Sequence, residues 1–180
     1  MDAILSGDVR FKTASSYKDD GFNISIKDDE LKIDYVLSNL RISVNDGPTI
    51  PVIDNKITMS AADDYYVSCF SVSCEPKLFV LFEYNACVVI KNADRFIDSV
   101  IAAYKSEYPA FEVNRGLVEY VDPFRKLKSD YPIEFQKICN FSYENEFRFV
   151  TFASGDYKYH DPIQTISIDK TGVEYEVINI

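Results

Sequence analysis

The sequence predicts an α+β fold, in which two or three helices are inserted among the strands of a mostly antiparallel, twisted sheet. Short segments that alternate apolar and polar residues recur along the chain, and only a few segments have helical periodicity. Strands and helices do not alternate regularly, as they would in βαβ winding. The 180 residues hold no repeat, low-complexity tract or linker, so we expect one domain over residues 1–180.

The expected strands are read from period-two alternation and from turn residues at their ends. Residues 9–14 alternate in this way, and the serines, aspartates and glycine of 15–21 follow them as a turn in which a functional loop could sit. The other expected strands span 22–26, 41–44, 65–72, 78–82, 86–91, 117–121, 143–152, 165–168 and 173–178.

The clearest helix is expected directly after Lys91. Asn92 is a good N-cap residue, and apolar side chains recur at 3.6-residue spacing from Phe96 to Tyr104. We expect one face of this helix to pack on the sheet. A second helical stretch, over 123–139, is interrupted near Pro132 because proline disfavours a continuous helix. A third and short one covers 29–40.

Composition and charge exclude several classes of function. With 47% hydrophobic and 27% charged residues the chain resembles an ordinary globular protein. Its 29 acidic and 19 basic side chains give a net charge of −10, which repels phosphate backbones, so we expect no direct nucleic-acid binding. The longest apolar run, 78–82, is too short to cross a membrane, and from the acidic and non-basic N-terminal residues we expect no signal peptide. We therefore expect a cytoplasmic protein.

The cysteines and the histidine give no sign of a metal site. The four cysteines form no Cys-x-x-Cys pair, and the chain has a single histidine, His160. We therefore expect no bound metal and interpret the cysteines as reduced thiols, since disulfides are rare in the cytosol.

The most informative pattern lies in residues 141–150. On a strand, Glu144, Glu146 and Arg148 would share one face, and Tyr143, Phe147 and Phe149 would share the other, the core face. Two carboxylates two residues apart on a strand are roughly 6 to 7 Å apart, close enough to act on one substrate. The same pattern is also typical of a solvated strand face, and Glu174-Tyr175-Glu176 repeats it.

This segment and three earlier ones resemble the domain-of-unknown-function 2971 family. Residues 141–148, with Lys137 before them, resemble its closing signature, Trp-x-Tyr-Glu-x-Glu-x-Arg after a lysine. In the same order, residues 11–19 resemble its Phe-Ser-x-Pro-Ser-x-Phe-Asn-Asp loop, residues 68–71 its Cys-Phe-Ser strand, and residues 118–122 its Val-x-Tyr element.

A more distant resemblance is to ADP-ribosyltransferases. It rests on an arginine on the first strand (Arg10), a serine-bearing strand at 68–73 and a late Glu-x-Glu (Glu144 and Glu146). The resemblance implies two packed sheets and a site that binds NAD and acts at its nicotinamide–ribose bond. Glu146 would hold the ribose hydroxyl near the carbon that gains positive charge, and Glu144 would orient or deprotonate the acceptor.

The same resemblance implies the residues that would bind NAD. Arg10 would pair with a phosphate or the ribose through its planar donors, Ser71 would hydrogen-bond near the ribose, and Tyr84 or Tyr17 would stack on nicotinamide. Arg148 is included in this set. Each residue also has an ordinary structural interpretation. Arg10 would be a polar residue on an edge strand, and Ser71 an ordinary strand hydroxyl. Tyr17 and Tyr84 would be rim or core aromatics, and Arg148 would pair with Glu146.

The alternative function belongs to another class. A small acidic, non-catalytic protein of phage or mobile-element type would bind a basic protein surface and act as an inhibitor. The charge of −10 would steer it to cationic patches, and its 13 tyrosines would supply interface anchors. Under both hypotheses we expect a protein partner or target.

Overall fold

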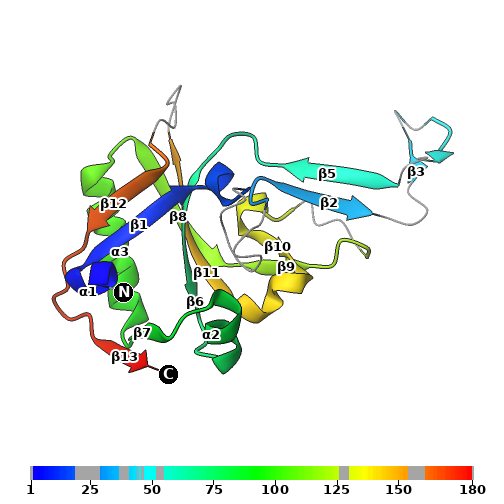
Figure 1. The fold of residues 1–180 in the computed structure, drawn as a ribbon. Coiled ribbons are helices and arrows are strands. Elements are labelled where there is room, and N and C mark those ends of the chain that lie inside the picture. Colours follow the sequence, from blue (N-terminus) through cyan, green and yellow to red (C-terminus); the bar gives the residue numbers. More distant parts are fainter. Residues whose placement is uncertain are drawn as a thin grey trace.

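The computed structural model describes residues 2–18, 29–36, 41–43, 45, 47–51, 55–125, 130–153 and 161–179 (Figure 1). Its centre is a five-stranded antiparallel sheet with the strand order β12-β1-β6-β11-β8. These strands are β1 (Asp8–Thr13), β6 (Tyr66–Ser71), β8 (Phe111–Leu117), β11 (Glu146–Ala153) and β12 (Ile163–Ser167). The predicted α+β fold with a mostly antiparallel sheet is confirmed.

Three α-helices accompany the sheet in the described part of the chain: α1 (Asp2–Ser6), α2 (Pro76–Phe82) and α3 (Ala93–Glu107). The long helix α3 begins where the sequence predicts, because the Asn92 side chain accepts a hydrogen bond from the backbone N–H of Arg95 at 3.0 Å. None of these helices is long and apolar enough to span a membrane.

Each face of the central sheet carries a buried core. On one face, α3 packs Phe96, Val100 and Tyr104 against an aromatic core centred on Phe149, whose side chain is fully buried. On the opposite face, Val67 and Val150 pack with neighbouring strand and loop residues in a second, smaller core. Where this second core covers β6 and β11, a charged side chain is removed from water and needs partners within the protein.

The remaining strands form two-stranded pairs. They are β2 (Lys32–Val36) with β5 (Lys56–Ser60), β3 (Arg41–Ile42) with β4 (Ile50–Pro51), β7 (Ala86–Ile90) with β13 (Tyr175–Asn179), and β9 (Glu119–Val121) with β10 (Gln136–Ile138). The described segments also contain three 3-10 helices: η1 (Ala14–Lys18), η2 (Ile133–Phe135) and η3 (Cys139–Glu144). The pair β9 and β10 is parallel, and the β2–β5 pair extends away from the central sheet (Figure 1).

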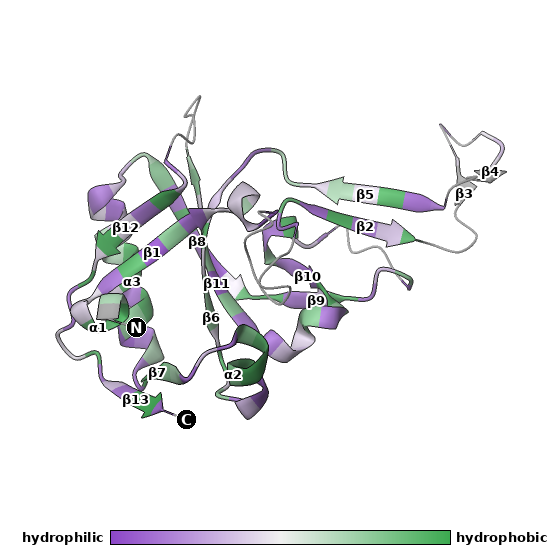
Figure 2. Cartoon of the chain, in the orientation of Figure 1, coloured by the Kyte–Doolittle hydropathy of each residue, from purple (hydrophilic) through white to green (hydrophobic). Residues whose placement is uncertain are grey.

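The strand expected at 78–82 is wrong, because these residues belong to helix α2. A run of five apolar residues fits a buried strand and an apolar helix equally well. Pro76 lies in the first turn of the helix, where proline needs no hydrogen-bonded N–H. Figure 2 shows α2 in the green of hydrophobic residues over most of its length.

The two other expected helices are also wrong. Residues 32–36 of the stretch 29–40 form strand β2, in which Ile33 and Tyr35 are buried and their neighbours are exposed. In the stretch 123–139, a turn at 123–125 is followed after Pro132 by η2, β10 and the start of η3. The strand expected at 22–26 lies outside the described residues.

Candidate active site

Five of the seven candidate site residues line one pocket, which we call the acidic pocket. They are Tyr17, Ser71, Tyr84, Glu144 and Glu146. The remaining lining residues are Glu30, Cys69, Phe70, Phe82 and Lys137, and the cavity has a volume of about 330 Å³. This size is at the lower end of the range typical of small-molecule sites.

Strand pairing and a sharp backbone turn bring the charged residues together. Glu146 on β11 lies opposite Ser71 on β6, and Arg148 lies opposite Cys69. The strand expected at 143–152 starts only at Glu146 in the structure, because Asn145 before it has a left-handed backbone with φ of 46°. Glu144 is therefore the last residue of η3, and its side chain reaches Lys137 on β10.

Arg148 is completely buried beneath the pocket and is held by three residues. Its Nε and Nη2 donate to the two carboxylate oxygens of Glu146 at 3.0 and 3.1 Å. Its Nη1 and Nη2 lie 2.7 and 3.0 Å from the carboxylate oxygens of Glu30, and Nη1 also donates to the backbone carbonyl of Glu134 at 3.0 Å. The guanidinium thus uses the full set of its donors within the protein.

The pair of Glu146 and Arg148 is a fixed ionic unit. Burial by itself would raise the pKa of Glu146, but the charges of Arg148 and Lys137 lower it below its ordinary value. Burial alone would lower the pKa of Arg148, but the neighbouring carboxylates raise it above its ordinary value. Glu146 and Arg148 are 5% and 0% exposed, so the interpretation of this segment as a solvated strand face is wrong.

Lys137 is the second cation of the cluster and is shared by three carboxylates. Its Nζ lies 2.7 Å from Glu144 Oε2 and 3.6 Å from oxygens of both Glu30 and Glu146. Burial alone would lower the pKa of Lys137, but these carboxylates raise it, so the ammonium stays charged. Two cations therefore balance only part of the charge of three glutamates.

Of the three glutamates, Glu144 has the fewest contacts that stabilise its charged form. Burial raises its pKa to about 7, because Lys137 offsets only part of the cost of desolvation and the other two carboxylates repel its charge. Oε2 accepts the hydrogen bond from Lys137, whereas Oε1 is buried and has no hydrogen-bond partner among the described residues. A carboxyl group with a pKa near 7 and a free oxygen in a pocket can take up and release a proton at neutral pH.

This raised pKa predicts how stability depends on pH. Folded Glu144 has a pKa of about 7 against 4.5 in the unfolded chain, so its contribution is full below pH 4.5 and is lost as the pH rises to 7. Glu144→Gln, which carries no charge, should therefore gain about 1 to 3 kcal/mol of stability relative to the native chain between pH 4.5 and pH 8. Urea unfolding at both pH values measures this difference.

The matched control for this measurement is Glu112→Gln, which alters an exposed glutamate on β8. Its stability relative to the native chain should change by less than about 0.5 kcal/mol over the same pH range. A constant difference between Glu144→Gln and the native chain at the two pH values would contradict the raised pKa.

Ser71 and the two tyrosines line the pocket in different ways. The Ser71 hydroxyl lies 2.7 Å from the backbone carbonyl of Glu144, so it also fixes the end of η3. Tyr84 is 61% exposed and stacks on Phe82, with ring centroids 6.2 Å apart. Tyr17 comes from η1, and burial raises the pKa of its hydroxyl, which stays protonated. Both rings are placed at a cavity wall, where a planar ligand could stack.

Arg10 and Arg148 do not line the pocket. Arg10 is an exposed residue of β1 and pairs with Thr165 on the edge strand β12, away from the segment of β1 that pairs with β6. Arg148 is fully buried, and its donors are occupied by protein atoms. In this arrangement Arg148 supports the carboxylates of the pocket.

The site includes one charged residue that the sequence did not indicate. Glu30 precedes β2 and is 118 positions away from Arg148, with which it pairs. It belongs to no motif, and pairing across such a distance leaves no local signal. The sequence indicates Lys137 only through the family resemblance, although Lys137 contacts all three carboxylates.

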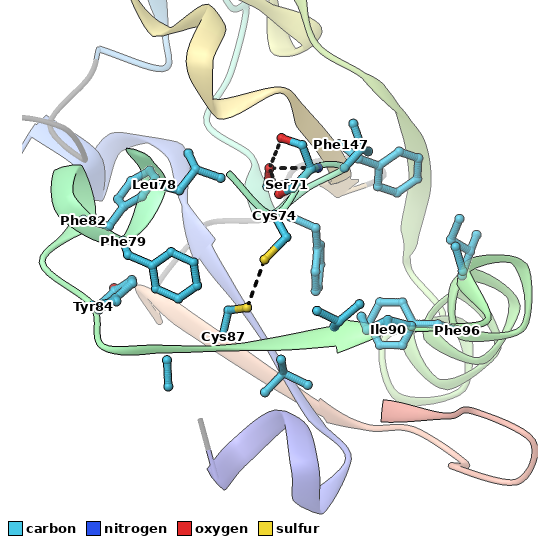
Figure 3. Close-up of a pocket in the computed structure, with 18 of the residues that line it drawn as sticks. Ser71, Cys74, Leu78, Phe79, Phe82, Tyr84, Cys87, Ile90, Phe96 and Phe147 are labelled. Carbon is cyan, nitrogen blue, oxygen red and sulfur yellow. Dashed lines mark hydrogen bonds between the residues drawn. The ribbon is translucent and has the colours of Figure 1, made fainter. Parts of the chain in front are cut away.

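A second, larger cavity adjoins the acidic pocket, and we call it the apolar pocket (Figure 3). It has a volume of about 490 Å³ and is lined by α2, β7 and the start of α3, with side chains that include Leu78, Phe79, Ile90, Phe96 and Phe147. The two cavities share Phe70, Ser71, Phe82 and Tyr84. A ligand held in the acidic pocket would therefore have an apolar surface next to it.

The described residues contain no group of three or more metal-binding side chains that could hold an ion. Comparisons of this chain with known protein families, with curated proteins and with solved structures found no match. The family resemblances described above therefore stay predictions, and a functional proposal depends on the geometry of the pocket.

Proposed function

We propose that this chain binds NAD in the acidic pocket and cleaves or transfers at the nicotinamide–ribose bond. The observation that carries the proposal is Glu144, a buried carboxyl group with a pKa of about 7 and an unpartnered oxygen in the described structure. It lies beside Glu146, a carboxylate that is held ionised and fixed by Arg148. Two carboxyl groups whose environments push their pKa values apart are typical of sites in which one group transfers a proton and the other stabilises charge.

The charge and shape of the pocket suit the nicotinamide half of NAD. Glu30, Glu144 and Glu146 outnumber the one cation in the lining, Lys137, and favour the positively charged nicotinamide ring over an anion. Tyr17 or Tyr84 would stack on this ring. The proposal assigns no phosphate to Arg10, because Arg10 lies outside the pocket.

The reaction would proceed by displacement at C1′ of the ribose. The acceptor, water or a target hydroxyl or amine, forms a bond to C1′ while the bond from C1′ to nicotinamide breaks. Nicotinamide leaves as a neutral molecule with the electron pair, and the acceptor proton passes to the Glu144 carboxylate. Glu146 accepts a hydrogen bond from the ribose hydroxyl and stabilises the positive charge that develops on the sugar.

The experiment that tests this proposal is release of nicotinamide. The native chain is incubated with NAD, alone and with a cell lysate that supplies acceptors, and free nicotinamide is quantified by chromatography. We expect nicotinamide release above that of a buffer blank in at least one of the two reactions. If the acceptor is a protein, we also expect the ADP-ribose part of NAD to become attached to that protein. A folded chain that neither releases nicotinamide nor binds NAD would refute the proposal.

The second candidate function, binding of a protein partner, is favoured by three exposed apolar side chains on and next to helix α2. Val72, Val80 and Tyr84 are 55%, 76% and 61% exposed, and they lie before, on and after helix α2. Exposed apolar residues grouped along one segment are typical of contact sites. The lysate reaction separates the two functions, because a partner recovered in stoichiometric amount without nicotinamide release favours binding alone.

A further inference from the structure

Two cysteines meet at the wall of the apolar pocket. Cys74 lies between β6 and α2, Cys87 lies on β7, and their sulfur atoms are 3.6 Å apart. Figure 3 shows the two side chains pointing toward one another. Cys74 is exposed and Cys87 is half-buried, so an oxidant in solution can reach the pair.

We propose that Cys74 and Cys87 are a redox-modification site that closes into a disulfide. A disulfide needs two cysteines whose side chains face each other at short range, and a contact of 3.6 Å between the sulfurs fulfils this condition with little movement. The other two cysteines are placed differently: Cys69 is on β6 opposite Arg148, and Cys139 begins η3.

The co-reactant is a peroxide, and the chemistry takes two steps. Cys74, as the more exposed thiol, attacks one oxygen of hydrogen peroxide as its thiolate; the O–O bond breaks, water is released, and Cys74 becomes a sulfenic acid. The sulfur of Cys87 then attacks the sulfur of Cys74, the S–O bond breaks, and a second water leaves. In total, two thiols and one hydrogen peroxide yield one disulfide and two waters.

The disulfide would tether the segment that carries helix α2. Cys74 precedes the helix and Cys87 follows it, so the bond closes a loop that contains α2 and Tyr84. This segment supplies Leu78, Phe79 and Phe82 to the apolar pocket. Oxidation would therefore restrict the opening of one pocket wall. The inference does not depend on the proposed NAD chemistry, because it concerns the dithiol alone.

Peptide mapping of the folded native chain tests the proposal. Lys77 lies between the two cysteines, so trypsin places Cys74 in the peptide 57–77 and Cys87 in the peptide 78–91. After treatment with a slight excess of hydrogen peroxide and alkylation of free thiols, we expect these peptides to be linked, with fragment ions that assign the link to Cys74. The link should disappear on reduction with dithiothreitol.

Cysteine variants identify the sulfurs involved. Cys69 is in the same peptide as Cys74, so Cys69→Ser is the matched control and should retain the link, whereas Cys74→Ser and Cys87→Ser should lose it. Hydrogen exchange provides a second readout, in which oxidation should slow exchange of the amides of 76–84 by about tenfold. Absence of the link in the native chain, or a link through Cys69 or Cys139, would overturn the proposal.

Discussion

Replacing Glu144 with glutamine should lower the rate of nicotinamide release from NAD by about 10² to 10⁴-fold, the usual contribution of a general base. Glutamine keeps the size of the side chain and can still accept the hydrogen bond that Lys137 donates at 2.7 Å. It cannot take a proton from the acceptor. Because the pocket and its charged partners are otherwise preserved, binding of NAD should change far less than turnover.

The pH profile separates a catalytic role of Glu144 from a structural one. As a general base Glu144 acts in its ionised form, so kcat/KM of the native chain should rise with pH and reach half of its plateau near pH 7, the pKa of this carboxyl group in the free protein. Glu144→Gln should lose this inflection. The measurement is the initial rate of nicotinamide release between pH 5 and pH 9.

Glu112→Gln serves as the control for turnover as it does for stability, because it removes one negative charge from β8 without altering the pocket lining. Its rate should remain within about twofold of the native rate. If Glu144→Gln also retains most of the native rate, Glu144 is not the general base. This outcome would not by itself contradict the proposal that NAD binds in the pocket.

The sequence predicts the central fold well where a local pattern decides the structure. Alternation indicates β1, and the spacing of apolar residues after the Asn92 cap indicates α3. Alternation is also present in β2, where Ile33 and Tyr35 are buried at period two, although a helix is predicted there. In α2 the apolar run itself is ambiguous, and Pro76 is the available sign of a helix start.

The candidate site is predicted only in part, for a physical reason. Glu144 and Glu146 belong to one motif, two residues apart. Their different pKa values depend on Glu30, Lys137 and Arg148, which tertiary packing brings close to them. A sequence motif identifies the two carboxyl groups and not which of them will be ionised. Desolvation and the partners across the sheet determine that difference, and both exist only after folding.

Replacing Arg148 with methionine should lower the free energy of unfolding at pH 7 by about 3 to 5 kcal/mol, as expected when one partner of a buried ion pair is removed. Methionine fills much of the same volume but offers no hydrogen-bond donor. Glu30 and Glu146 would stay buried, 6% and 5% exposed, with Lys137 as their one remaining cation at 3.6 Å. Urea unfolding followed by circular dichroism measures the loss.

The matched control is Arg125→Met, since Arg125 is 85% exposed and pairs with Asp122 on the surface. The free energy of unfolding of Arg125→Met should fall by no more than about 1 kcal/mol.

The pH dependence of stability adds a second criterion. In the native chain Arg148 lowers the pKa of Glu146, so this contribution to stability is present above the unfolded pKa and is lost as the pH falls through the folded pKa. In Arg148→Met the pKa of the buried Glu146 should instead rise, and Glu146 should bind a proton on folding. The stability deficit of the variant relative to the native chain should therefore shrink between pH 7 and pH 5. A deficit below about 1 kcal/mol, or one that does not change with pH, would contradict a role of Arg148 as the charge that keeps Glu146 ionised beneath the pocket.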